Sequence, residues 1–266
     1  MRIARFTTGE DPQYGVVTGD VDELGIPADD AVVVALAGDP LYVGVQLTDQ
    51  EIPLSQVRLL APVLPRSKVV GIGRNYAAHA AELGHEVPDE PMMFIKPNTS
   101  VVGPGDPVFY PSQSSEVHFE GELCVVIGRI CRDVAPDRVP DVVYGYTVGN
   151  DVTARDLQRK DKQFTRSKGF DSFCPLGPWI ETELDPSDLR VTTHLNGDLQ
   201  QDGTTKDLIF DVPSLVSYVS SVMTLLPGDV IMTGTPEGVG PMQVGDEVEV
   251  TVAGIGSLTN KVVKRD

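Results

Sequence analysis

Basic residues are scarce in this chain. Its 21 Lys and Arg stand against 39 Asp and Glu, which gives a formal net charge of −18 at pH 7. Such an acidic surface repels the phosphates of nucleic acids, so no nucleic-acid partner is expected. No apolar run approaches the roughly 18 residues of a membrane span, and the first ten residues contain no apolar core of a secretory signal. We therefore expect a cytoplasmic protein with no membrane segment.

Cysteine is equally scarce, with only Cys124, Cys131 and Cys174, and none of them forms a C-x-x-C pair. This count and spacing argue against a disulfide framework and against a cysteine-rich zinc site. We expect all three cysteines to be buried, because cysteine is among the residue types most often found in cores. The rest of the composition, 41% hydrophobic and 23% charged over 266 residues, is typical of a globular protein.

Nucleotide-binding motifs are also missing. The run Gly71-Ile72-Gly73-Arg74-Asn75-Tyr76 begins like a dinucleotide fingerprint, but a tyrosine takes the place of its third glycine. That glycine permits close approach of helix and strand, so the substitution argues against a nicotinamide oxidoreductase. The chain contains no P-loop, no nucleophile elbow and no H-E-x-x-H motif.

The acidic residues are unevenly distributed. Residues 1–57 contain ten acidic and two basic residues, a net charge of −8, whereas the remaining 209 residues carry −10. Short β-like runs separated by turn residues occur in this first segment at residues 2–6, 14–18, 31–34 and 42–46. We predict a small β-rich N-terminal domain over residues 1–60 and a catalytic domain over residues 61–266.

The second segment is rich in β-branched residues, which favour strands. We predict strands at residues 117–127, 142–149, 190–195, 229–233 and 247–252. Helices are predicted at residues 76–83, 155–163 and 213–224. Because strands and helices do not alternate regularly, a doubly wound parallel sheet is not indicated, and a mixed, β-rich α+β fold is expected.

A pair of carboxylates lies at the start of an apolar run, in His118-Phe119-Glu120-Gly121-Glu122. Alternate side chains of a strand share a face, so His118, Glu120 and Glu122 are predicted to point the same way. Burying two neighbouring carboxylates is costly unless a cation compensates their charge. Ligation by carboxylates alone favours Mg²⁺ or Mn²⁺. The alternative is a solvated polar face on an edge strand.

A third carboxylate, Asp151, falls where a predicted strand ends and a helix begins. Three carboxylates would leave positions on an octahedral Mg²⁺ open for water or for a chelating substrate. The alternative for Asp151 is a plain helix N-cap.

His79 and Glu82 are three residues apart and fall on one face of the predicted helix at residues 76–83. A carboxylate beside an imidazole orients the ring and raises its basicity, which predicts a general-base dyad. The alternative is an incidental pair on a surface helix. Residues 82–91, with their glycine and prolines, are predicted to form a mobile lid.

Six segments in order resemble the fumarylacetoacetate hydrolase family, in its prokaryotic branch with a short N-terminal domain. They are GRNYAAH (73–79), FIKP (94–97), HFEGE (118–122), NDVTARDLQ (150–158), KGFDSFCPLGPW (168–179) and TGTPEGVG (233–240). The branch includes 2-hydroxyhepta-2,4-diene-1,7-dioate isomerases and acylpyruvate hydrolases. The resemblance implies the family's β-roll fold for the catalytic domain, with a homodimer as the usual assembly.

The resemblance also implies roles for the residues identified above. Glu120, Glu122 and Asp151 would be the ligands of Mg²⁺ or Mn²⁺. His79 and Glu82 would form the base dyad, on a segment that becomes ordered when the substrate binds.

Four further residues would contact the substrate if the resemblance holds. Lys168 and Gln158 would contact its oxygens, with Lys168 adding positive charge where an enolate develops. Arg155 would help to attract an acidic substrate, and Thr235 would hold a carboxylate at the turn after a strand.

The implied activity is that of a divalent-metal-dependent enzyme acting on 2-oxo or 2-hydroxy-enoic dicarboxylic acids through a metal-stabilised enolate. Within the family, a 2-hydroxyhepta-2,4-diene-1,7-dioate isomerase/decarboxylase of aromatic-compound catabolism is favoured. An acylpyruvate C–C hydrolase and an oxaloacetate decarboxylase are the alternatives. From another class, the alternative is a non-catalytic protein that binds 2-oxo acids.

Overall fold

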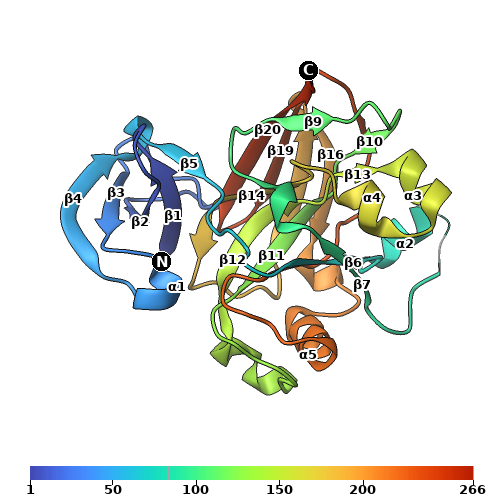
Figure 1. The fold of residues 1–266 in the computed structure, drawn as a ribbon, viewed down its shortest axis with the longest axis horizontal. Coiled ribbons are helices and arrows are strands. Elements are labelled where there is room, and N and C mark those ends of the chain that lie inside the picture. The colour runs from blue at the N-terminus through green and yellow to red at the C-terminus, as the bar shows by residue number, and fades with distance from the viewer. Residues whose placement is uncertain (83, 85, 266) are drawn as a thin grey trace.

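The computed structural model describes residues 1–82, 84 and 86–265, and one long sheet runs through the molecule (Figure 1). Its strand order is β4-β3-β2-β1-β14-β12-β11-β17-β6-β7, with β5 pairing to β1 and β8 to β14. The bounds are β1 Arg2–Thr7, β2 Gln13–Thr18, β3 Val32–Leu36, β4 Leu47–Pro53, β5 Arg58–Leu60, β6 Val69–Gly73, β7 Met92–Lys96, β8 Val101–Val102, β11 Gly121–Ile127, β12 Val143–Asn150, β14 Cys174–Glu181 and β17 Val230–Met232. The β-rich mixed α+β fold predicted from the sequence is confirmed.

Two smaller sheets complete the β structure. A five-stranded sheet has the order β16-β15-β19-β20-β9, and a three-stranded sheet has the order β13-β10-β18. The bounds are β9 Val108–Tyr110, β10 Val117–His118, β13 Thr153–Ala154, β15 Arg190–Leu195, β16 Asp198–Thr204, β18 Pro241–Met242, β19 Glu247–Val252 and β20 Gly256–Lys264.

Helices are short and lie around the sheets. The α-helices are α1 Pro40–Val43, α2 Ala77–Glu82, α3 Arg155–Asp161, α4 Phe164–Lys168 and α5 Val212–Val222, and the 3-10 turns are η1 Leu54–Gln56, η2 Asn98–Ser100, η3 Pro136–Asp141 and η4 Thr205–Asp207. In Figure 1, α2, α3 and α4 gather at the same end of the molecule, away from the N-terminal strands. Within the described residues, no helix has the length and apolar character needed to cross a membrane.

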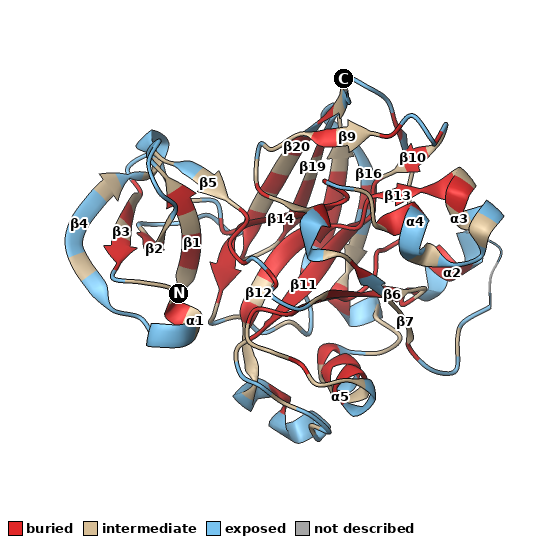
Figure 2. Ribbon diagram, viewed as in Figure 1, coloured by how far each residue is buried: buried red, intermediate tan, exposed pale blue. Residues whose placement is uncertain are grey.

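The core lies between the long sheet and the five-stranded sheet. Every residue of β11 and of β14 is buried, and Figure 2 shows these strands among the most continuously buried parts of the fold. A strand covered on both faces needs no alternation of polar and apolar residues. This is why the run Leu123-Cys124-Val125-Val126-Ile127 is uniformly apolar.

The N-terminal strands are continuous with the long sheet. β1 pairs antiparallel with β14, with Arg2 opposite Glu181 and Ile3 opposite Ile180. Ile3 is fully buried in a hydrophobic cluster that also contains Cys124, a residue of β11. Residues 1–60 therefore share both a sheet and part of a core with the rest of the chain.

One predicted strand in this segment is wrong. Residues 42–46 were expected to be β-like, but α1 ends at Val43 and the next strand, β4, begins at Leu47. The local sequence explains the helix, because Asp39 Oδ1 accepts a hydrogen bond from the Leu41 N–H (3.0 Å) and Pro40 occupies the first turn.

The predicted strand at residues 117–127 is divided. It forms β10 and β11, with Phe119 and Glu120 between them in neither strand. The Glu120 N–H donates to the Asn150 side-chain oxygen (2.9 Å) instead of to a neighbouring backbone. The alternative of a polar face on an edge strand is excluded, since β11 lies between β12 and β17.

Two other expectations need correction. The predicted helix at residues 155–163 ends at Asp161, and a second helix, α4, follows it. Lys162 ends the first helix in a left-handed conformation (φ 58°).

Cys124 and Cys174 are buried as expected, but Cys131 is only partly buried. The predicted helix at 76–83 corresponds to α2, and position 83 lies outside the described residues.

Candidate active site

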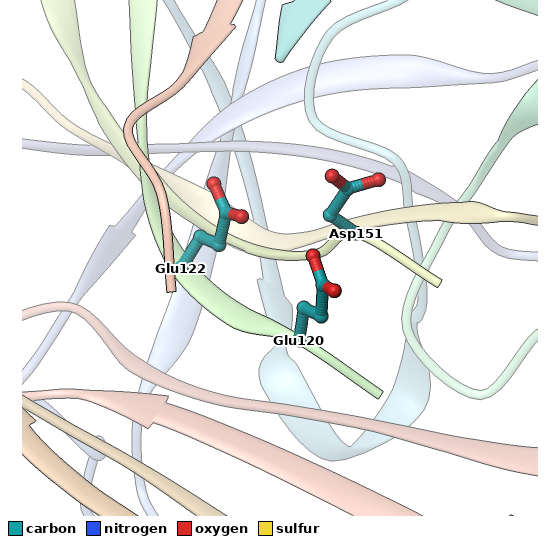
Figure 3. Close-up of side chains that lie close together, drawn as sticks. All are labelled: Glu120, Glu122 and Asp151. Carbon is teal, nitrogen blue, oxygen red and sulfur yellow. The ribbon is translucent and has the colours of Figure 1, made fainter. Parts of the chain in front are cut away.

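Three buried carboxylates meet where β11 begins and β12 ends. Gly121 pairs with Asn150 across these antiparallel strands, which brings Glu120 and Glu122 beside Asp151. The Asp151 N–H donates to the Glu120 carbonyl oxygen (2.8 Å) and holds the two segments together. One oxygen from each carboxylate lies within 4.8 Å of the others, and Figure 3 shows the three side chains converging.

Two of these carboxylates contact buried cations. Lys168 Nζ donates to Glu120 (2.8 Å) and to Asp151 (2.5 Å), and so it joins the two. Arg155 contacts the other Glu120 oxygen, and Lys96 contacts the other Asp151 oxygen. All three cations are at least 96% buried, Lys96 completely. The plain N-cap alternative for Asp151 is excluded, because the residue at the N-cap of α3 is Ala154.

The third carboxylate, Glu122, has no cation partner among the described residues. Its Oε2 accepts a hydrogen bond from the Gly234 N–H (2.7 Å). Burial, together with the charges of Asp151 and Glu120, raises the pKa of Glu122 well above its usual value. For Glu120, burial acts in the same direction, but Lys168 and Arg155 outweigh it and hold the pKa below its usual value.

This donor set fits a hard divalent cation. It offers carboxylate oxygens at close range, and Glu122, whose pKa is raised by burial and by the neighbouring carboxylates, has no cation in contact with it among the described residues. Oxygen-only ligation is the chemistry of Mg²⁺ and Mn²⁺ sites. Glu120, Glu122 and Asp151 are therefore the residues that could hold such an ion.

His79 lies next to Glu82 on α2, with 3.2 Å between His79 Nδ1 and Glu82 Oε2. The imidazole is buried, which excludes the alternative of an incidental pair on a helix surface. Glu82 is fixed from its other side, because its Oε1 accepts a hydrogen bond from the Gly238 N–H (3.0 Å). The predicted lid at residues 82–91 includes positions 83 and 85, which lie outside the described residues.

A cavity of about 340 Å³ opens beside the carboxylates. Seven of the residues predicted to form the site line it: His79, Glu120, Glu122, Arg155, Gln158, Lys168 and Thr235. Asp151 and Glu82 do not line it, and they contact residues that do. The remaining lining residues include three cations, Arg74, Arg159 and Lys162.

Two of the predicted substrate-contacting residues are already engaged by neighbours. The Thr235 hydroxyl donates to the Gly121 carbonyl oxygen (2.9 Å) and accepts from Gln201 Nε2 (2.8 Å). Gln158 Oε1 accepts from the Arg155 guanidinium (2.7 Å). These bonds fix the orientation of both side chains at the cavity wall.

His118 does not join the carboxylates, contrary to the predicted alternation. Its ring lies beside Glu116 (3.1 Å between Nε2 and Oε1), and it is not among the described residues that line the cavity. The break between β10 and β11 changes the direction of the side chains, so the rule of alternate faces does not extend across Phe119.

Sequence reasoning gave no role to Lys96, Arg74 or Lys162. Lys96 and Arg74 belong to segments that carried the family resemblance, FIKP and GRNYAAH, and this was the only signal for them. Lys162 lies outside those segments. Its part in the cavity wall depends on how α3 ends, which the sequence pattern did not indicate.

Residues 68–263 match the family described as "Fumarylacetoacetate (FAA) hydrolase C-terminal", and residues 1–62 match "Rv2993c-like, N-terminal". The first match covers well over half of the chain, so the chain belongs to the fumarylacetoacetate hydrolase family. This confirms the family predicted from the six segments. Enzymes of the family, among them isomerases and hydrolases, act on small molecules.

Two solved structures are similar over essentially their whole length. A 5-carboxymethyl-2-hydroxymuconate delta-isomerase from Mycobacterium smegmatis is 49% identical, with 100% of each chain covered and a TM-score of 0.90. A 2-hydroxyhepta-2,4-diene-1,7-dioate isomerase from Mycobacterium marinum is 46% identical, covering 100% of this chain and 99% of that one, also with a TM-score of 0.90.

Other relatives carry different activities. The maleylpyruvate hydrolase of Sphingobium sp. SYK-6, solved with manganese(II) and pyruvate, is 34% identical over 100% of both chains, with a TM-score of 0.80. Oxaloacetate tautomerase YisK of Bacillus subtilis is 41% identical over 79% of this chain and 74% of its own.

Proposed function

We propose that the protein is a Mg²⁺- or Mn²⁺-dependent enzyme acting on 2-oxo or 2-hydroxy-enoic dicarboxylic acids, of the 2-hydroxyhepta-2,4-diene-1,7-dioate isomerase/decarboxylase type. The observation that carries the proposal is the buried group of Glu120, Glu122 and Asp151, the first two of which line a cavity. The two isomerase structures at 46% and 49% identity support this reaction type. A bound dication would act as a Lewis acid toward the 1-carboxylate and 2-oxo end of the substrate.

The residues around the carboxylates have complementary roles in this proposal. Lys168, buried at the cavity wall, would stabilise negative charge developing on the 2-oxo oxygen. His79, oriented by Glu82, would move the proton at the neighbouring carbon, or would activate water if the reaction is hydrolytic. Arg155 and Gln158, which are hydrogen-bonded to each other, would position substrate oxygens. Thr235 would hold a carboxylate at the turn after β17.

A second carboxylate on the substrate would find cations at the other lining residues. Arg74 and Lys162 line the cavity and have no acidic partner among the described residues. Arg159 also lines it, but this guanidinium already pairs with Glu116. A cation whose charge is not neutralised by a neighbour is available to bind a carboxylate, which supports a dicarboxylate substrate.

Hydrolysis of an acylpyruvate and reactions of oxaloacetate remain the alternatives. Each has support in a named relative, the maleylpyruvate hydrolase and the oxaloacetate tautomerase. The same base and the same cation-binding carboxylates would serve all of these reactions. The distinction lies in whether a proton is transferred between the 2-oxygen and a carbon of the substrate chain, or whether carbon dioxide or an acyl group leaves the carbon next to the 2-oxo group.

The test is to measure turnover together with metal binding. The purified protein with Mn²⁺ should convert a hydroxydienedioate faster than an acylpyruvate or oxaloacetate. Glu122→Gln should weaken Mn²⁺ binding about a hundredfold or more in titration calorimetry, because it removes one of three charged ligands. Glu181→Gln, a buried glutamate far along the sheet, should leave Mn²⁺ affinity unchanged. Bound Mn²⁺ without turnover of any of the three substrates would leave the non-catalytic binding protein as the better explanation.

A further inference from the structure

Lys96 is the completely buried lysine at the end of β7. Its Nζ contacts Asp151 Oδ1 and lies 3.4 Å from the carbonyl oxygen of Val152. It is not among the described residues that line the cavity, so it has no direct route to a substrate. Lys96 can therefore affect the site only through its contact with Asp151 and through its charge.

Counted formally, the charges of the buried carboxylates and of the cations beside them sum to zero without a metal ion. The three carboxylates, Glu120, Glu122 and Asp151, equal in number the three cations that contact Glu120 and Asp151, which are Lys96, Lys168 and Arg155. A dication added to this set leaves an excess of two positive charges in a buried place, which is unfavourable. An anionic ligand that binds beside the dication removes that excess.

We propose that Lys96 is a positioning residue that makes the centre bind a dication and an anionic 2-oxo acid together, rather than the dication alone. It holds Asp151 by one oxygen and cancels part of the charge that would otherwise attract the metal. The inference rests on the proposed function, because it requires both a metal ion and an acidic ligand at this site. By thermodynamic reciprocity, each of the two ligands then raises the affinity for the other by the same factor.

The first experiment uses the native protein and no variant. Mn²⁺ is titrated by calorimetry with and without a fixed concentration of oxalate, a dianionic chelator, and the titration of Mn²⁺ into oxalate alone is subtracted. We expect oxalate to raise Mn²⁺ affinity roughly 5- to 150-fold, the usual range of coupling between two sites. Oxalate binding, measured with and without Mn²⁺, should change by the same factor.

The second experiment changes Lys96. In Lys96→Met, the affinity for Mn²⁺ alone should rise about tenfold, because one positive charge near the dication is removed. The enhancement by oxalate should shrink, since less excess positive charge remains to be balanced. Lys96→Arg keeps the charge and should retain most of the native coupling.

Lys68 provides a matched control. It pairs with the buried Asp229, and so Lys68→Met also removes the partner of a buried aspartate. This pair lies outside the cavity, and neither Mn²⁺ affinity nor the oxalate effect should change in the variant. A loss of stability in both lysine variants, with altered coupling only in Lys96→Met, supports the proposal.

The possible failures are distinct. If the native protein binds Mn²⁺ equally well with and without oxalate, the inference is wrong while the metal site stands. If Lys96→Met weakens Mn²⁺ binding by one common factor in both conditions, Lys96 merely anchors Asp151, and the charge argument is overturned. If the native protein does not bind Mn²⁺ in either condition, the proposed function falls as well.

Discussion

The acidic residues of the N-terminal segment and those of the cavity differ in their surroundings. Of the ten acidic residues at positions 1–57, nine are exposed, and Asp39 is half-buried. In contrast, Glu120, Glu122 and Asp151 are at least 96% buried and are placed among lysines, an arginine and a backbone amide. Exposed charges contribute mainly solubility, whereas buried ones require specific partners. The overall net charge is therefore a poor guide to what the cavity binds.

The largest expected effect is a loss of turnover on replacing His79, a residue that lines the cavity. His79→Gln should lower turnover about 10²- to 10⁴-fold, because a positioned general base contributes that much to proton transfer. The affinity for Mn²⁺ should stay within twofold of the native value, as His79 is not one of the candidate ligands. Steady-state kinetics and calorimetry test the two halves of this prediction.

His194→Gln is the control for that variant. His194 lines a different cavity, beside residues of β15 and β19, and its replacement should leave turnover unchanged. Equal losses of Mn²⁺ affinity and turnover in His79→Gln would instead assign His79 a structural role at the carboxylates.

The next largest expected effect is a loss of stability on truncating a buried side chain of the N-terminal segment. Ile3→Ala should lower the free energy of unfolding by about 2–5 kcal/mol, the usual cost of truncating a large core side chain. Ile3 is fully buried where β1 joins β14. Ile26→Ala, at a side chain that is 40% exposed, should change stability by less than about 0.5 kcal/mol.

Chemical denaturation of both variants measures this difference, and the Mn²⁺ affinity of folded Ile3→Ala should match the native value. An altered affinity in Ile3→Ala would contradict the separation between the two regions, and would show that the shared sheet transmits changes to the site.

The smallest expected effect concerns substrate length. Arg74→Met should raise the KM for a dicarboxylate about tenfold, the effect of losing one charged contact of ordinary strength. The KM for an acylpyruvate without a second carboxylate should not change. Arg66→Met is the control, since this guanidinium lies over the Tyr42 ring and not in the cavity. Equal changes of KM for both substrates would remove Arg74 from the recognition of a second carboxylate.

Much of the fold could be predicted where strands carry the expected residue types. Residues 190–195 and 247–252 are strands with the predicted bounds, and the helix predicted at 213–224 corresponds to α5. By contrast, β14 contains two prolines and a glycine, and β16 is mostly polar, with Leu199 as its one large apolar residue, so neither has a strand-like sequence. Their neighbours in the sheets impose the extended conformation on them.

The candidate site was predictable to a similar degree. The three carboxylates, His79 and Lys168 were identified from spacing and from the family segments, and the structure brings them together beside one cavity, which all of them except Asp151 line. The side chain of His118 was wrongly predicted to share a face with Glu120 and Glu122, because a strand was assumed to continue through Phe119. The roles of the individual residues, the domain boundary near residue 61 and the homodimer stay predictions.

The sequence by itself determined the family and the three carboxylates, because these are encoded in short ordered segments. Only the tertiary structure decided which cation neutralises which carboxylate. Lys96 reaches Asp151 across 55 positions of chain, since β6 pairs with β17 and so brings β7 toward β11. The charge balance of a buried site depends on such long-range pairings, which no local pattern of residues records.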